Sequence, residues 1–340
     1  MTAVARDPEP LLSVEGLTVR LTRGGEHGPA LVDDVSLDVG RGEIVCLVGE
    51  SGSGKSVTAR TIMGLTQLDR SLAVDLRMRF AGESIDGPAR AAALRGRELA
   101  MVFQEPMSSL DPLFTIESQL AESLRRRHGR LPRAERRARM LRLLADVGIH
   151  DGERVLRSHP HELSGGMCQR VMIASALACE PDLLIADEPT TALDVTVQAQ
   201  ILELIDRLRA ERGMAVLLVT HDMGVAAEVA DRVVMMYSGR VVEEASPGEA
   251  FFDARHPYTR GLLACIPPMT GERAARLSAI PGMVPDPAHR PRGCPFSPRC
   301  ELADDRCREE DPALTQERGR RYACWNPIGV KTPDVAGATP

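Results

Sequence analysis

The chain has 340 residues, of which 43% are hydrophobic, enough for one large domain or two smaller ones with a sizeable core. Its net charge of −6 gives no general attraction to nucleic acid, and an aromatic content of 3% leaves few side chains to stack on bases. No stretch approaches the roughly 18–20 consecutive apolar residues of a membrane span, and residues 1–10 lack the apolar core of a secretory signal. We therefore expect any role at a membrane to depend on partner chains.

The first elements predict two kinds of sheet. Residues 11–39 alternate apolar and polar side chains around Gly24–Gly25, which indicates antiparallel strands. Residues 44–48 form a continuous apolar run, which is typical of a strand buried on both faces of a parallel sheet. A glycine-rich loop follows, and then a helical pattern over residues 55–65.

The middle of the chain is predicted to be mostly helical. Residues 117–147 have apolar positions spaced three and four apart and carry many arginines. These arginines form either a basic docking surface or a solvated helix face, and the solvated face is favoured. Residues 183–186 and 215–219 are further buried strands, separated by a helix over 195–212, and residues 233–242 indicate a hairpin.

The composition changes after about residue 267, where proline becomes frequent and the periodicity fades. We therefore predict a main domain over residues 1–269, a small loop-rich appendage over 270–326 and a flexible tail over 327–340. There is no internal repeat, so the chain carries one copy of the main domain.

Residues 49–56, Gly-Glu-Ser-Gly-Ser-Gly-Lys-Ser, match the phosphate-binding pattern G-x-x-x-x-G-K-[ST]. The glycines let successive N–H groups point at phosphate oxygens, and the loop opens onto a helix N-terminus that favours anions. Lys55 is predicted to reach the β- and γ-phosphates, and the Ser56 hydroxyl to bind Mg²⁺. A plain glycine-rich turn is the alternative, but the strand before it and the helix after it are what phosphate binding requires. The predicted nucleotide-binding residues of this loop are Gly49, Glu50, Ser51, Gly52, Ser53, Gly54, Lys55, Ser56 and Val57.

Two acids end the apolar run at residues 183–186. Asp187 and Glu188 would lie at the carboxyl edge of the sheet, where ligands bind in open α/β folds. Asp187 is predicted to hold Mg²⁺, directly or through water. Glu188 is predicted to turn towards the γ-phosphate and to orient or deprotonate the attacking water.

Residues 163–170, Leu-Ser-Gly-Gly-Met-Cys-Gln-Arg, are similar to the LSGGQ-type signature of ABC ATPases and lie about twenty residues before Asp187, as in that family. Gln104 matches its Q-loop, residues 192–194 its D-loop and His221 its switch histidine. Together with the phosphate loop and the acid pair, these segments resemble the ABC ATPase family over roughly residues 11–244.

The resemblance implies an α/β fold of the P-loop NTPase type. It has an antiparallel β subdomain and an inserted helical subdomain over about residues 105–180, and here it also carries the cysteine-rich appendage. It implies an ATPase whose catalytic residues are Glu188, His221, Lys55 and Gln104, with Mg²⁺ held by Ser56, Gln104 and Asp187. It also implies that Ser164, Gly165 and Gly166 reach the ATP held by a second ABC ATPase subunit, a related heterodimer partner or another copy of this chain.

Two positions depart from the family pattern. Leu21 stands where the family usually has an aromatic that stacks on adenine, which leaves base stacking and the strength of nucleotide binding open. Cys168 stands where peptide-importer relatives usually carry arginine, beyond the Ser-Gly-Gly contacts.

Residues 103–112, 256–260 and 293–300 resemble the oligopeptide/dipeptide importer branch of the family, so that the likeness extends to about Trp325. The resemblance implies peptide uptake at the cytoplasmic face of the cell membrane, with two membrane permease subunits and an extracytoplasmic solute-binding protein. Nickel, glutathione and oligosaccharides remain alternative solutes. A soluble ABC ATPase acting on nucleic acid or ribosomes, and a non-hydrolysing regulatory module, are the rival functions.

Four of the eight cysteines cluster near the C-terminus with the spacing C-x₅-C-x₆-C-x₁₆-C. Four thiolates can complete one [4Fe–4S] cluster or a tetrahedral zinc site, although structural zinc usually uses closer pairs. The branch resemblance suggests the iron–sulfur cluster, and four reduced structural cysteines are the third interpretation. The predicted ligands are Cys294, Cys300, Cys307 and Cys324.

Overall fold

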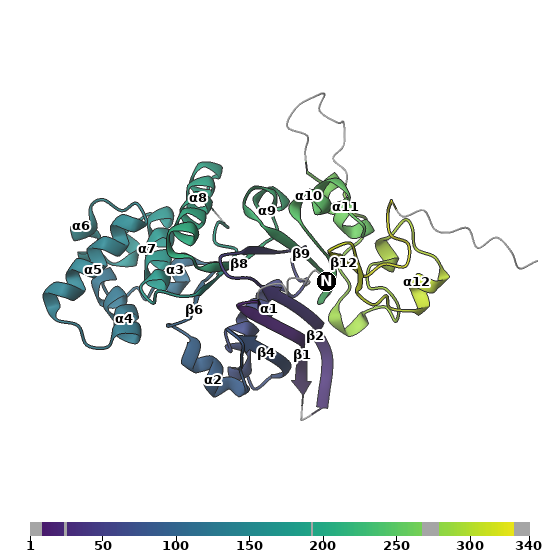
Figure 1. Ribbon diagram of the computed structural model, residues 1–340, viewed down its shortest axis with the longest axis horizontal. Helices are drawn as coiled ribbons and strands as arrows, with labels where there is room; N and C mark the ends of the chain where they lie inside the picture. The colour runs from purple at the N-terminus through teal and green to yellow at the C-terminus, as the bar shows by residue number, and fades with distance from the viewer. Residues whose placement is uncertain (1–8, 24–25, 192, 267–278, 330–340) are drawn as a thin grey trace, which may run out of the picture.

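The computed structural model describes residues 9–23, 26–191, 193–266 and 279–329. These residues form a four-stranded sheet of order β2-β1-β4-β5 and an eight-stranded sheet of order β11-β12-β10-β9-β3-β8-β7-β6 (Figure 1). The strands are β1 (Leu12–Arg23), β2 (Glu26–Val39), β3 (Ile44–Val48), β4 (Leu72–Phe80), β5 (Glu83–Ser84), β6 (Leu99–Val102), β7 (Leu183–Asp187), β8 (Ala215–Thr220), β9 (Arg232–Tyr237), β10 (Arg240–Ala245), β11 (Thr315–Glu317) and β12 (Arg320–Tyr322).

The helices lie on both sides of the large sheet and beyond its β6 edge (Figure 1). They are α1 (Lys55–Ile62), α2 (Gly87–Leu94), α3 (Pro106–Ser109), α4 (Ile116–His128), α5 (Arg133–Asp146), α6 (Gly152–Arg157), α7 (Gly165–Leu177), α8 (Val195–Arg212), α9 (Met223–Val229), α10 (Pro247–Phe252), α11 (Pro257–Ala264) and α12 (Asp305–Glu309). Short 3₁₀ turns are η1 (Thr66–Leu68), η2 (Pro160–Glu162), η3 (Pro287–His289) and η4 (Ser297–Arg299).

The centre of the large sheet is parallel, as the apolar runs predict. Strand β3 pairs in parallel with both β8 and β9, and β7 pairs in parallel with β8 and β6. Every residue of β3 is buried, and alternate residues enter different cores. Cys46 packs towards the helices α7 and α8, whereas Val45 and Leu47 pack towards α1 and the small sheet. The strand is therefore apolar along its whole length because both of its faces are covered.

The small sheet confirms the antiparallel strands predicted for residues 11–39, with β1 between β2 and β4. Its Gly24–Gly25 turn lies outside the described residues. The hairpin predicted over residues 233–242 is also confirmed, because β9 and β10 pair antiparallel around Ser238 and Gly239. Gly239 has φ of 81°, and a Cβ there would lie 2.5 Å from the Leu31 carbonyl oxygen, so the turn requires glycine.

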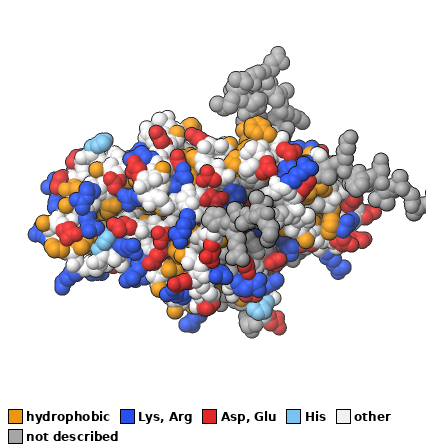
Figure 2. Space-filling view, in the orientation of Figure 1, with side chains coloured by type: hydrophobic (Ala, Val, Ile, Leu, Met, Phe, Trp, Pro, Cys, Tyr) orange, Lys and Arg blue, Asp and Glu red, His pale blue; other side chains and the backbone are white. Residues whose placement is uncertain are grey.

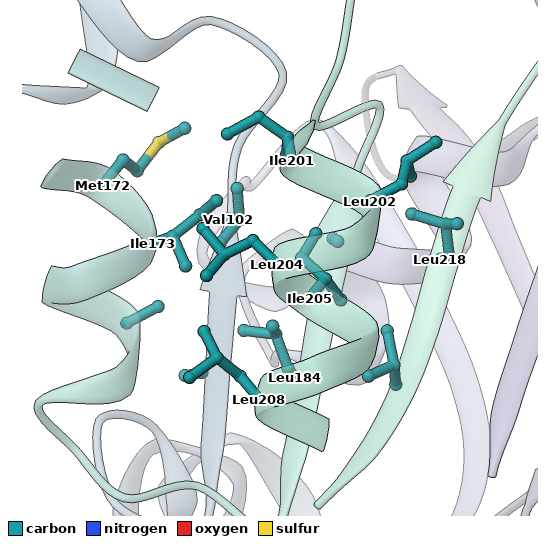
Figure 3. Close-up of a cluster of buried hydrophobic side chains, with 14 of the residues drawn as sticks. Val102, Met172, Ile173, Leu184, Ile201, Leu202, Leu204, Ile205, Leu208 and Leu218 are labelled. Atoms are coloured by element: carbon teal, nitrogen blue, oxygen red, sulfur yellow. The ribbon is translucent and has the colours of Figure 1, made fainter. Parts of the chain in front are cut away.

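Helix α8 covers one face of the parallel strands (Figure 3). Val102, Leu184 and Leu218, one from each of the strands β6, β7 and β8, share a buried cluster with the apolar face of α8 and with Ile173 of α7. This shared cluster packs the three strands and the two helices into one core.

The helical pattern predicted over residues 117–147 is confirmed, and it is divided between two helices, α4 and α5. Gly129 has φ of 69° at the end of α4, and Pro132 has no N–H to continue a helical hydrogen-bond ladder, so the chain turns between them. The arginines of these helices pair with glutamates on the same surface, where Arg125 meets Glu122 and Arg139 meets Glu135. Figure 2 shows acidic and basic side chains interspersed at this end, which favours the solvated face.

The predicted domain boundary near residue 269 lies outside the described residues, as does the predicted tail from residue 330 onwards. The first residues of that predicted tail are described, and Ile328 exchanges two hydrogen bonds with Arg255. The described C-terminal part does not stand apart from the large sheet, because β12 pairs antiparallel with β10 and adds β11 at the edge. Composition does not predict this pairing, since strands of three residues are too short for a periodic pattern. No helix in the described ranges is long and apolar enough to span a membrane.

Candidate functional site

The phosphate-loop motif runs from the carboxyl end of β3 into the first turn of α1. A Cβ at Gly49 would lie 2.2 Å from the Met236 carbonyl oxygen, so this position admits only glycine. Gly52 and Gly54 have φ of 80° and 99°, in the region that side-chain-bearing residues avoid. Ser51 and Gly52 are exposed, whereas Ser53 is buried. The loop thus has the compact, glycine-dependent bend that a phosphate-binding loop requires.

Lys55 is the buried cation of the loop, with 4% of its surface exposed. Its Nζ donates to the carbonyl oxygens of Gly49 at 2.7 Å and Glu50 at 3.0 Å. Burial lowers the pKa of this amine, while the nearby carboxylates of Glu188 and Asp187 act in the opposite direction. The Lys55 ammonium can therefore leave these two carbonyl oxygens and bind an anion, because a charged acceptor forms a stronger hydrogen bond than a neutral carbonyl does.

Asp187 ends β7 with a fully buried side chain. Its Oδ1 accepts a hydrogen bond from the Ser56 hydroxyl at 2.8 Å, while Oδ2 has no hydrogen-bond partner. Burial raises the pKa of this carboxyl above its ordinary value, because the charged form loses hydration. Oδ2 lies 4.0 Å from Nε of Arg60, which pairs with it as an ion and not through a hydrogen bond. A buried carboxylate oxygen that accepts no hydrogen bond, next to a serine hydroxyl, is a donor set that suits a hard cation such as Mg²⁺.

Two predicted side chains, those of Gln104 and His221, meet at one oxygen of Glu188. Its Oε2 accepts from Gln104 Nε2 at 2.9 Å and lies 3.3 Å from Nδ1 of His221. Thr191, which the sequence did not predict, donates to the same oxygen at 2.8 Å. Glu188 has φ of 47°, a left-handed conformation that is uncommon outside glycine.

The topology explains why these residues meet. Gln104 follows β6, Asp187 and Glu188 close β7, His221 follows β8, and the phosphate loop follows β3. These four strands are adjacent and parallel, so their carboxyl ends lie at one edge of the sheet.

The signature residues do not join this cluster within the chain. Ser164 caps α7 by accepting from Met167 N–H at 3.3 Å, and both Ser164 and Gly165 are exposed. Nothing lies within 4 Å of a Cβ built on Gly165. The turn is thus open to contact by another molecule. Cys168 is fully buried behind it, and its thiol contacts the Pro160 carbonyl oxygen at 3.4 Å.

The four C-terminal cysteines line a single small pocket together with His256, Phe296 and Trp325. Burial raises the pKa of each of these thiols, to about 11 for Cys294 and about 12 for Cys324. The pocket has about 10 Å³ of free space. No group of three or more His, Cys, Asp or Glu side chains within the described ranges is arranged to hold a single metal ion.

Comparison with known proteins decides the family. A family model described as ABC transporter matches residues 32–191, and one described as oligopeptide/dipeptide transporter, C-terminal region, matches residues 242–307. The oligopeptide transport ATP-binding protein AppD of Bacillus subtilis is 47% identical, over 93% of this chain and 96% of its own length. The chain belongs to the ABC transporter ATPases. The dipeptide transport ATP-binding protein DppD of Escherichia coli is 45% identical, over 94% of this chain and 97% of its own length.

Solved structures agree with this assignment to the ABC ATPases. The dimeric bacterial ABC transporter cassette MJ0796 is 30% identical with a TM-score of 0.61, and the alignment covers 69% of this chain and 98% of that one. CbiO1 of Clostridium perfringens, part of an ABC transporter complex, is 27% identical with a TM-score of 0.60, over 72% of this chain and 92% of its own. The ABC ATPase fold predicted from the sequence is confirmed.

Two contacts of this ABC ATPase were not predicted. The hydroxyl of Tyr258 accepts from the Glu50 N–H at 2.8 Å, and the carboxylate of Glu50 pairs with Arg299 at 2.6 Å. Both partners are more than 200 residues away in the chain. The sequence stretches that contain them resembled the importer branch, but nothing in their spacing indicated contact with the phosphate loop.

Proposed function

We propose that this chain hydrolyses ATP at the cytoplasmic face of the cell membrane to drive the import of di- or oligopeptides. The observation that carries the proposal is the meeting of Gln104 and His221 at the Glu188 carboxylate, beside the phosphate loop. The peptide assignment rests on relatives named for oligopeptide and dipeptide transport. Nickel, glutathione and oligosaccharide import, and a soluble role on nucleic acid or ribosomes, are the alternatives that the experiment below separates.

The phosphate loop, residues 49–57, would bind the triphosphate through those of its N–H groups that are not already bonded, as that of Glu50 is to the Tyr258 hydroxyl. Lys55 would exchange the carbonyl oxygens of Gly49 and Glu50 for β- and γ-phosphate oxygens, since hydrogen bonds between charged partners are roughly twice as strong as neutral ones.

Ser56, Asp187 and Gln104 would hold Mg²⁺. The buried Asp187 Oδ2 without a hydrogen-bond partner supports this assignment. The ion supplies neutralisation of phosphate charge during transfer.

Glu188 would orient the attacking water and accept its proton. Gln104, Thr191 and His221 bind one of its two carboxylate oxygens, which fixes the side chain and leaves the second oxygen to the water. His221 is 58% exposed at its side chain, so it can also reach towards a γ-phosphate. A positioned carboxylate of this kind contributes about 10²–10⁴-fold to a rate.

A second ABC ATPase subunit would complete the site. The exposed Ser164 and Gly165 lie at the start of α7, where N–H groups can bind the γ-phosphate of ATP held by the partner. The dimeric relative MJ0796 supports this arrangement. We propose a related heterodimer partner in preference to a second copy of this chain.

The helices α3 to α7 would form a subdomain that transmits movement to two permease subunits. A groove of about 600 Å³ runs between these helices and the β6 side of the sheet, lined by Phe103, Leu110 and Phe114 among others. Met107, Leu113 and Phe114 are exposed beside it, with 48%, 80% and 52% of their surfaces accessible. Exposed apolar side chains around a groove are typical of a protein-binding site. An extracytoplasmic solute-binding protein would deliver the solute.

The cysteine pocket would hold a [4Fe–4S] cluster. Four thiols on one pocket are the donor set that such a cluster uses, one for each iron. The pocket must widen to admit it, because little free space is present. The cluster would then stabilise a segment with few apolar residues of its own.

Reconstitution of the chain with its copurifying subunits in vesicles tests the proposal. We expect permease subunits to copurify, and di- or oligopeptides with a binding protein to stimulate ATP hydrolysis. Stimulation by nickel, glutathione or an oligosaccharide alone would replace the peptide assignment. Copurification with ribosomes or nucleic acid, without permeases, would refute the transporter role.

A further inference from the structure

The C-terminal segment reaches the phosphate loop through one arginine. Arg299 ends η4, the turn between Cys294 and Cys300, and its side chain is only 4% exposed. Its two terminal nitrogens bind the two carboxylate oxygens of Glu50, Nη1 to Oε2 at 2.6 Å and Nη2 to Oε1 at 3.0 Å. This is the fork geometry in which an arginine binds a carboxylate most strongly.

Contacts outside the phosphate loop also hold the Arg299 side chain in position. Its Nε donates to the Pro281 carbonyl oxygen at 2.8 Å. The guanidinium lies 5.7 Å from the ring centre of Tyr237 and 6.0 Å from that of Phe296, and both rings are buried. The side chain therefore loses little further freedom when it binds Glu50.

Each polar group of Glu50 has a hydrogen-bond or ion-pair partner. Its N–H donates to the Tyr258 hydroxyl, its carbonyl oxygen accepts from Lys55, and its carboxylate binds Arg299. Tyr258 is fully buried and packs against Phe296 with ring centres 5.4 Å apart. The conformation of the loop at this residue is thus set partly by the C-terminal segment.

The negative charge of Glu50 would repel a bound triphosphate, and the ion pair with Arg299 neutralises that charge. Phosphate binding by the loop needs only its backbone N–H groups and Lys55, so a carboxylate within the loop adds repulsion towards a triphosphate. The fork neutralises that carboxylate and holds it against the aromatic rings. Removing Arg299 would leave a free negative charge in the loop and release its second residue.

We propose that Arg299 is a positioning residue of the ATP site, which neutralises the Glu50 carboxylate and thereby sets the affinity of the phosphate loop for ATP. The C-terminal segment would then be part of the nucleotide-binding apparatus, whether or not its cysteines hold a cluster. Arg299 itself does not contact the nucleotide.

Titration of the purified full-length chain with a fluorescent ATP analogue and Mg²⁺ tests this proposal. We expect Arg299→Ala to raise the dissociation constant roughly tenfold, and Arg299→Lys to raise it less, because lysine restores charge without the fork. The double variant Glu50→Gln/Arg299→Ala should return to within about threefold of the wild type, since the repulsive carboxylate is gone. Arg308→Ala removes another arginine of this segment, one paired with Asp305 on the surface, and should bind as the wild type does.

The rescue separates positioning from mere folding. If Arg299→Ala acted by unfolding the segment, removing the Glu50 charge would restore nothing, and the double variant would bind as weakly as the single one. That result would overturn the proposal, as would an unchanged dissociation constant in Arg299→Ala. A wild-type chain that binds no ATP would instead refute the ATP site itself.

Discussion

The proposed ATP site and the cysteine pocket are built in opposite ways. Side chains of the ATP site come from the carboxyl ends of four adjacent parallel strands, so the sheet itself places Lys55, Gln104, Glu188 and His221 near one another. The cysteine pocket draws its thiols from short turns and a five-residue helix, with the pair β11 and β12 as its nearby sheet. The residues of the proposed ATP site are positioned by the strands of the sheet. The cysteines are positioned by short turns and by individual side-chain contacts.

This difference decides how each region should respond to substitution. Loss of one side chain from the ATP site should remove a chemical step and leave the sheet intact. Loss of one cysteine should alter the local fold, because the turns that carry the thiols are not held by a regular sheet or a long helix. The predictions below test that contrast.

Glu188→Gln should have the largest effect. The amide keeps the shape of the side chain but cannot accept a proton, so ATP hydrolysis should fall by about 10²–10⁴-fold while ATP binding changes little. Phosphate release and nucleotide titration measure the two quantities. Glu180→Gln is the matched control, because Glu180 also has positive φ, of 48°, but lies exposed before β7. Equal rates of ATP hydrolysis in the wild type and in Glu188→Gln would show that Glu188 has no role in the chemical step.

Lys55→Ala should weaken ATP binding by roughly a hundredfold, because it removes two charge-assisted hydrogen bonds. Burial lowers the pKa of Lys55, so its ammonium is lost at a lower pH than that of an ordinary lysine. Wild-type affinity should therefore decline as pH rises towards that pKa, whereas the affinity of Lys55→Ala should not follow this decline. Parallel pH profiles of the two proteins would contradict the role assigned to Lys55.

Cys307→Ser should remove most of the iron and the brown colour of anaerobically purified protein, and should lower its melting temperature. Cys265→Ser is the control, since this half-buried thiol bonds the Gly261 carbonyl oxygen and lies outside the pocket. Iron and sulfide analysis with calorimetry would measure both effects. A colourless wild type containing one zinc ion, or no metal, would refute the cluster.

Asp187→Asn should cause the smallest change in melting temperature among these variants. The change should be an increase, because the substitution removes a buried charge. Because burial raises the pKa of Asp187, its ionised form costs stability, and that cost grows as pH rises through the raised pKa. The asparagine keeps an oxygen for the Ser56 hydroxyl and removes the charge, so the melting temperature at neutral pH should rise by about 2 °C without nucleotide. Mg²⁺-dependent ATP binding should be lost. A lower melting temperature in calorimetry would show that the buried carboxylate stabilises the fold.

The sequence predicted which residues the structure brings together at the proposed ATP site, because these residues belong to short contiguous motifs that follow buried strands. Apolar runs located β3, β7 and β8, and the residues that follow these strands were the predicted ones. The periodicity over residues 117–147 indicated helix but did not locate the break between α4 and α5, which falls at Gly129 and Pro132. Thr191 was missed because a threonine after an acid pair is too common to indicate contact.

The contacts between distant segments were not predictable. Nothing in the spacing of Glu50 and Arg299 indicates that they pair, because 249 residues separate them and neither belongs to a periodic pattern. The same holds for β12 on β10, where only two residue pairs define the register. Such contacts depend on the packed tertiary structure, which no local pattern encodes.

The most direct test is an experimental structure of the dimer of this chain with its partner ATPase subunit, carrying the Glu188→Gln substitution and bound to Mg²⁺ and ATP. We predict Lys55 on phosphate oxygens instead of the Gly49 and Glu50 carbonyls, the γ-phosphate beside residue 188 and His221, and the Ser164 turn of one subunit on the other's nucleotide. A nucleotide bound elsewhere, with Lys55 still on those two carbonyls, would contradict the account.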